Sequence, residues 1–183
     1  GVLSVILLES ANQKWSENTT TKELNSEIVW FNNTIDANIK LQQEESKTSI
    51  DLYTNVKLLK DTIAVRFDKS LIEVFDSRWL FNPKNEVKLL PSKILIKDLE
   101  ISHENQSLAF DGVYAPDSTT KINVEVNNFD LVNLSTFVPR DFAGTLTTKG
   151  RITKLGREAP YRFETMVRID DLIFDDYLVG NLN

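Results

Sequence analysis

The chain contains one histidine, His103, and no cysteine, so two of the side chains most used in nucleophilic, acid–base and metal chemistry are nearly absent. An acid–base or metal role for His103 would require partners at a defined spacing, and the sequence has no second histidine. No nucleophile-elbow, P-loop or dinucleotide-binding motif is present. We interpret His103, in ISHENQ, as a turn residue in water, and we expect no catalytic residue, metal site, cofactor or enzymatic activity.

Three glycines recur every six residues, at Gly144, Gly150 and Gly156, in AGTLTTKGRITKLG. A phosphate cradle requires a helix N-terminus directly after the glycine. The residues between these glycines instead alternate between apolar and polar, as in a strand. The pattern therefore favours strand bends or bulges.

Four acidic residues lie close together near the end of the sequence, at Asp170, Asp171, Asp175 and Asp176. Calcium would be the ion that such a cluster suits, but neighbouring residues of a strand point to opposite faces and the spacing departs from the calcium-loop pattern. We interpret these acids as a solvated turn.

Apolar residues recur with a period of two in the stretches that would position any site. This period is typical of strands with one buried face. The stretches that show this alternation are TIDANIKL, SIDLYTNVKL, TIAVRFD, KILIKD, SLAFDGVY, KINVEV and YRFETMVRI. Regular alternation favours antiparallel sheet, here of roughly ten to twelve strands. The opening GVLSVILLE is too short for a membrane span and is also predicted as a strand, whereas the polar stretch from Glu9 to Asn25 is expected to be a loop or a weak edge strand.

One stretch, FDLVNLSTFVP, predicts a short helix from Asp130 to Phe137. Asp130 is a suitable N-cap, and Leu131, Leu134 and Phe137 share one helical face. Pro139 would end the helix.

The totals are those of a folded protein, with 183 residues, 41% hydrophobic residues and 26% charged residues. The 27 acidic and 21 basic residues give a net charge of −6, and no basic stripe is present, which argues against nucleic acid as a partner. We expect residues 1–183 to be a single β-rich segment cut from a longer repetitive protein.

From Ser70 onward the sequence shows an ordered series of motifs. IKDLEI is followed by NQSLAFDG, then by INVEVNNFDLVNL, FAGTLTTKGRITKLG, APYRFETMVRI and DDLIFDDYLVGNL. This order resembles the periplasmic region of the TamB family, the translocation and assembly module subunits of the AsmA-like superfamily. The content of Asn and Lys is more similar to a Bacteroidetes member than to an enterobacterial one.

The resemblance implies an all-β fold, with a long, curved, mostly antiparallel sheet folded into an open apolar trough (a β-taco). It also implies the periplasmic region of an inner-membrane-anchored protein of a Gram-negative bacterium. The partners would be an outer-membrane barrel protein resembling TamA and the acyl chains of phospholipids. Lipid transport to the outer membrane and outer-membrane protein assembly are the functions assigned to the family, which offers no catalytic residues.

We expect the trough to be lined by apolar residues on the alternating strands of the half that carries the resemblance. These residues are Ile94, Ile96, Ile122, Val124, Val126, Phe163, Val167 and Ile169.

Two other functions compete with this one. A closed β-sandwich acting as an adhesion or carbohydrate-binding module would bind ligands at loops or on exposed aromatic residues, although Trp15, Trp30 and Trp79 are scattered along the sequence. An enzyme on a β scaffold would need a nucleophile, a base and an orienting group, and no such set is visible.

Overall fold

The computed structural model describes residues 3–16, 19–43, 48–74, 77–136 and 140–183. Over these residues the chain is all-β, as predicted. Its fourteen strands belong to one antiparallel sheet, accompanied by a single 3₁₀ turn. The chain divides into two compact units, Gly1–Pro91 and Ser92–Asn183.

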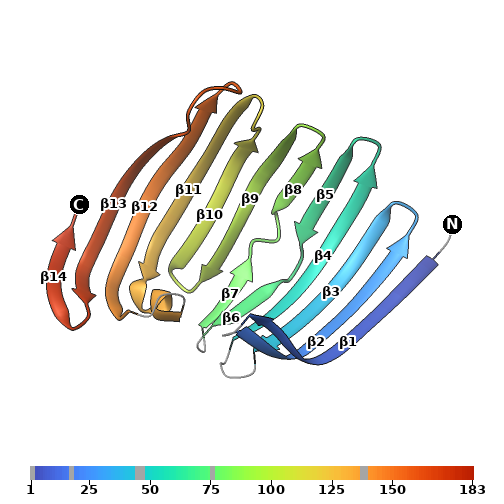
Figure 1. Cartoon of the computed structure of the whole chain (residues 1–183), viewed down its shortest axis with the longest axis horizontal. Coiled ribbons are helices and arrows are strands. Elements are labelled where there is room, and N and C mark those ends of the chain that lie inside the picture. Colours follow the sequence, from blue (N-terminus) through green and yellow to red (C-terminus); the bar gives the residue numbers. More distant parts are fainter. Residues whose placement is uncertain (1–2, 17–18, 44–47, 75–76, 137–139) are drawn as a thin grey trace. The chain divides into compact units, whose positions relative to one another are not determined.

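Unit 1 contains eight strands. They are β1 (Leu3–Ser16), β2 (Thr19–Phe31), β3 (Thr34–Gln43), β4 (Ser49–Leu59), β5 (Thr62–Phe67), β6 (Leu71–Val74), β7 (Ser77–Phe81) and β8 (Glu86–Leu90). The hydrogen-bonded order is β1-β2-β3-β4-β5-β8, and β6 pairs with the first residues of β4 and with β7. The long strands β1 to β4 run side by side (Figure 1).

The predicted strands of unit 1 form where the alternation is regular, and the prediction is only partly right where polar residues interrupt it. Of the segment expected to be a loop or a weak edge strand, residues 9–16 lie in β1, which is at the edge of the sheet, whereas residues 19–25 lie in β2, which is not at an edge. Glu9 and Asn25 are directly opposed in the β1–β2 ladder. Asn and Thr in this segment pair across strands and so satisfy the backbone even without an apolar pattern.

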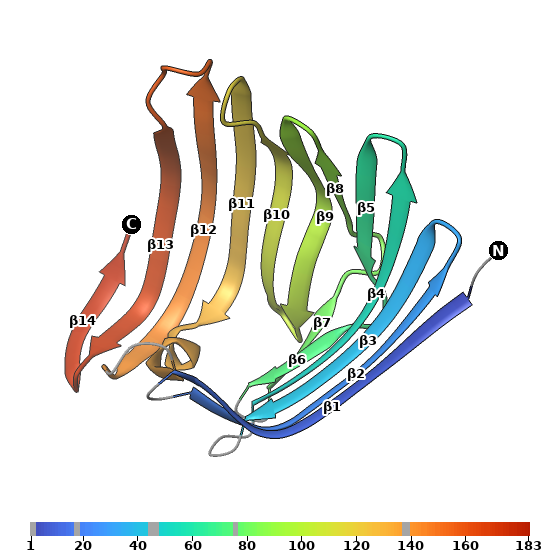
Figure 2. The ribbon, with the colours of Figure 1, turned by 45° about the vertical axis from the view of Figure 1, so that its right-hand side comes forward.

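Unit 2 contains six strands joined as successive neighbours in the order β9-β10-β11-β12-β13-β14. Their bounds are β9 (Lys93–His103), β10 (Gln106–Tyr114), β11 (Thr119–Asp130), β12 (Phe142–Leu155), β13 (Arg162–Phe174) and β14 (Tyr177–Leu182). Figures 1 and 2 show these strands as a meander, with the helical turn η1 (Leu131–Thr136) at the end of β11.

The predicted short helix is present as this 3₁₀ turn rather than as an α-helix. Asp130 is its N-cap, because the backbone N–H of Val132 donates to Asp130 Oδ1 at 3.0 Å. Short segments with few intrahelical hydrogen bonds commonly adopt the tighter 3₁₀ form. Phe137 and Pro139, which the prediction also used, lie outside the described residues. Within the turn, Leu131 is buried.

Three of the β-bulges in the strands of unit 2 contain an Asp or Asn with a positive φ. These residues are Asp98 (φ 49°), Asn128 (φ 48°) and Asp171 (φ 53°). Each bulge adds one residue to its strand, so apolar residues three positions apart share a face. The three four-residue stretches are Ile96–Leu99, Val126–Phe129 and Ile169–Leu172.

The same type of hydrogen bond, from a backbone N–H to a side chain, supports all three bulges. The backbone N–H of Asp98 donates to Asp111 Oδ2 at 3.3 Å. That of Asn128 donates to Thr147 Oγ1 at 3.3 Å, and that of Asp171 donates to Asn181 Oδ1 at 2.9 Å. In each case the acceptor belongs to the next strand, so the N–H removed from the ladder keeps a partner.

The terminal acidic residues divide between two features. Asp175 and Asp176, with φ of 45° and 68°, form the two-residue turn between β13 and β14, as predicted. Asp170 and Asp171 were also expected in a turn, and this prediction is wrong. They lie within β13, at its bulge.

Candidate functional site

All eight residues predicted to line an apolar surface lie on one face of unit 2. Directly opposed residues of an antiparallel pair project to the same face. Ile122 lies opposite Ile152, which lies opposite Phe163. We call this surface the apolar face of unit 2.

The strand β9 joins this face through β10. Ile96 lies opposite Gly112, and Gly112 lies opposite Ile122. Ile94 lies opposite Tyr114, two residues further along β10. The remaining four predicted residues follow by the two-residue period along β11 and β13.

The structure adds apolar residues that the sequence pattern had not assigned to this surface. They are Leu99, Ile101, Leu108, Phe110, Phe129, Phe142, Leu146, Ile152, Leu172 and Phe174. Three of these residues do not fit a strict period of two because each follows a bulge. They are Leu99, Phe129 and Leu172. A repeated four-residue pattern could have identified them. In this pattern an apolar residue is followed by a polar residue, then by Asp or Asn, and then by a second apolar residue.

The apolar face of unit 2 is open rather than packed as a core. None of the eight predicted residues is buried, and Phe163 keeps 72% of its surface exposed. The buried apolar residues described in unit 2 are Ala115, Phe129 and Leu131, and the last two lie at or next to η1. Near η1, Phe142 and Phe174 pack with ring centroids 5.2 Å apart. The face is therefore buried next to η1, half-buried at most of its positions, and exposed at Phe110, Phe163, Val167 and Phe174.

The opposite face of unit 2 is charged. Lys149 forms an ion pair with Glu125 at 2.7 Å, and this contact lowers the pKa of the Glu125 carboxyl group. Arg151 donates to Asn123 Oδ1 at 3.1 Å. A face with ion pairs at the surface is suited to water, whereas the apolar face is not.

Unit 1 repeats this division into an apolar and a polar face. Ile35, Val56 and Val65 lie opposite one another on β3, β4 and β5. On the same strands, Asp36 lies opposite Asn55, and Asn55 lies opposite Arg66 on the other face. The alternation of the sequence therefore produces one apolar face in each unit.

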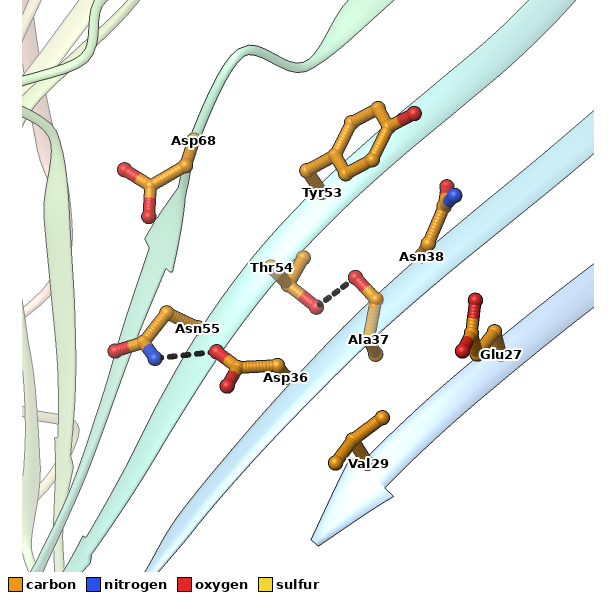
Figure 3. A pocket seen from close by; sticks show the side chains of 9 residues that line it. All are labelled: Glu27, Val29, Asp36, Ala37, Asn38, Tyr53, Thr54, Asn55 and Asp68. Atoms are coloured by element: carbon orange, nitrogen blue, oxygen red, sulfur yellow. Dashed lines mark hydrogen bonds between the residues drawn. The ribbon is translucent and has the colours of Figure 1, made fainter. Parts of the chain in front are cut away.

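The polar face of unit 1 carries a hollow of about 350 Å³ (Figure 3). Its floor is held by a 2.6 Å hydrogen bond from Asn55 Nδ2 to Asp36 Oδ1 and by one from Thr54 Oγ1 to the carbonyl of Ala37 at 3.3 Å. The residues that line it are Glu27, Val29, Asp36, Ala37, Asn38, Tyr53, Thr54, Asn55 and Asp68. Its amides and carboxylates could bind hydroxyl groups, but only one aromatic side chain contributes.

His103 is the last residue of β9 and lies opposite Gln106, next to the Glu104–Asn105 turn. Over the described residues, no three His, Cys, Asp or Glu side chains are grouped so that they could hold a metal ion. Trp79 is buried, with 4% of its surface exposed, and Trp30 donates through Nε1 to the carbonyl of Asn32. The side chain of Trp15 is outside the described part of the chain.

No helix within the described ranges is both long enough and apolar enough to cross a membrane. No known family model, curated protein or solved structure matches the chain.

Proposed function

We propose that the chain is a segment of a periplasm-spanning, inner-membrane-anchored protein resembling the TamB family, and that its apolar faces carry phospholipid acyl chains toward the outer membrane. The observation that carries this proposal is the open apolar face of unit 2. On this face Phe163 and Val167 are exposed, and Phe163 lies in one row with Ile152 and Ile122. Covering such apolar surface is favourable in water.

An acyl chain is a physically suitable cover. Apolar surface gains about 25 cal/mol for each Å² removed from water, and an acyl chain offers apolar surface with no hydrogen-bonding groups to satisfy. The strands of the face run side by side, so a chain can move along it without breaking a specific contact. In the proposed function the sheet curves into an open trough, and an outer-membrane barrel resembling TamA receives the lipid.

The test uses two positions on β13 that differ in face but not in exposure. Phe163 is 72% exposed on the apolar face, and Met166 is 73% exposed on the charged face. A photo-crosslinking amino acid is placed at each position in turn, and the purified protein is irradiated with vesicles of phosphatidylethanolamine and phosphatidylglycerol. We expect lipid adducts, detected by mass spectrometry, at position 163 and few or none at position 166.

Equal labelling at the two positions, or no labelling at 163, would contradict the proposal. Because both side chains are largely exposed, neither replacement removes core packing, and a negative result cannot be attributed to misfolding.

A further inference from the structure

The apolar face of unit 2 changes chemical character at one end, just beyond the row of Ile122, Ile152 and Phe163. Lys154 lies two residues beyond Ile152 on β12, so its side chain is on the same face. Its ammonium nitrogen lies 5.2 Å from the centre of the Tyr161 ring. This contact places a cation and an aromatic hydroxyl at the end of the apolar surface.

A second tyrosine reaches the same place from another strand. Tyr114 ends β10 opposite Ile94, on the apolar face. The Tyr161 hydroxyl interacts with it and raises the pKa of the Tyr114 hydroxyl. In the strand order, β11 and β12 lie between β10, which Tyr114 ends, and β13, which Tyr161 precedes. We call Tyr114, Lys154 and Tyr161 the polar row.

The charge of Lys154 is not neutralised within the described part of the chain. Its ammonium group donates to the carbonyl oxygen of Pro116 at 2.7 Å, and none of the ion pairs there involves it. The nearby Arg157 and Asp117 are paired with each other at 3.3 Å. A lysine held by a neutral carbonyl and an aromatic face keeps its positive charge available to an anion.

Apolar surface followed by tyrosine hydroxyls and an ammonium group is the arrangement that an amphiphile requires. Tyrosine combines an apolar ring with a polar tip, which suits the boundary between acyl chain and headgroup. We infer that the polar row receives the phosphate of an anionic phospholipid, whose acyl chains lie along the apolar face of unit 2. The inference rests on the proposed function and adds to it the class of headgroup.

The experiment measures the affinity of the full chain for soluble short-chain lipids by isothermal titration calorimetry. The probes are dihexanoyl phosphatidylglycerol, which is anionic, dihexanoyl phosphatidylcholine, which is zwitterionic, and inorganic phosphate. We expect the anionic lipid to bind roughly threefold to tenfold more tightly than the zwitterionic one at low salt, and the difference to shrink at about 0.5 M salt.

Two matched variants identify the source of that preference. Lys154→Gln keeps a hydrogen-bond donor for Pro116 but removes the charge, and it should abolish the preference while leaving the affinity for the zwitterionic lipid unchanged. Lys121→Gln removes an exposed lysine from the opposite face, beside Ile122 in sequence, and should leave both affinities unchanged. Circular dichroism checks that both variants keep their strands.

Three outcomes would overturn the inference. Equal affinity of the unmodified chain for the two lipids, or a preference that survives in Lys154→Gln, would show that the polar row does not select the headgroup and would leave the proposed function standing. Binding of inorganic phosphate as tightly as the anionic lipid would show an anion site without a role for the acyl chains. Failure to bind any lipid, together with no labelling at position 163, would overturn the proposed function as well.

Discussion

Two glycines of the apolar face show how differently one residue type can be constrained. Gly112 has a φ of 138°, and a Cβ placed there would overlap the carbonyl oxygen of Lys121 on β11. Gly150 has an ordinary strand φ, and a Cβ there would lie 3.5 Å from Thr165 Oγ1, in normal van der Waals contact. Backbone geometry therefore requires glycine at the first position and does not require it at the second.

The expected outcome is that Gly112→Ala destabilises the chain by about 2 kcal/mol or more, because the added Cβ forces both a strained φ and a backbone shift. Gly150→Ala should be neutral or should stabilise by up to about 1 kcal/mol through lower entropy of the unfolded chain. Urea unfolding followed by circular dichroism measures both. Equal destabilisation by the two substitutions would show that Gly112 is not held as the structure describes.

At the scale of the strands, the bulges at Asp98, Asn128 and Asp171 keep the apolar face continuous. Without the extra residue, the apolar side chain that follows each bulge would turn to the charged face. Asp and Asn suit these positions because they tolerate the left-handed backbone better than other side chains. The similar stretches IKDL, at residues 96–99, and IDDL, at residues 169–172, thus mark the same type of bulged strand.

We expect Asp171→Gly to be neutral or mildly stabilising, since glycine adopts a φ of 53° without strain. Asp171→Val should cost about 1–3 kcal/mol, because a β-branched residue is strongly disfavoured at positive φ. Both variants retain the backbone N–H that donates to Asn181, so the comparison isolates the backbone conformation. Chemical unfolding provides the measurement, and a valine variant as stable as the glycine variant would argue against this bulge.

At the scale of the molecule, each unit has one polar and one apolar face, and few of the apolar side chains that the structure describes are fully buried. The buried apolar residues described are Ala64, Trp79, Ala115, Phe129 and Leu131. Most of the apolar surface thus remains accessible to a ligand, and the response to an introduced charge should depend on position.

Ile122→Asp places a carboxylate at a half-buried position of the apolar face, where water can still reach it, so we expect the chain to fold with a loss of about 1–2 kcal/mol. Phe129→Asp places the same charge at a site with 9% exposure, where an unpaired carboxylate costs several kcal/mol. Thermal unfolding separates the two cases, and lipid labelling at position 163 should fall in Ile122→Asp. Complete unfolding of Ile122→Asp would mean that the face is sealed.

The sequence by itself determined the regularly alternating strands and eight members of the apolar face. The seven alternating stretches all lie in strands, with only their end residues Asp68 and Tyr161 outside, and the eight proposed residues share one face, because the period of two is a local property of an extended chain. Polar segments carry no such signal, which is why the paired residues around Glu9 and Asn25 were expected in a loop or a weak edge strand.

Only the tertiary structure decided which strands are neighbours and therefore which distant residues meet. Tyr114 reaches Tyr161, and Lys154 reaches Pro116, through pairings among β10, β11, β12 and β13 that local periodicity cannot specify. The left-handed residues at the bulges likewise depend on acceptors from the next strand. The burial of Phe129 and the exposure of Phe163 follow from packing in three dimensions, since both positions have the same apolar character in sequence.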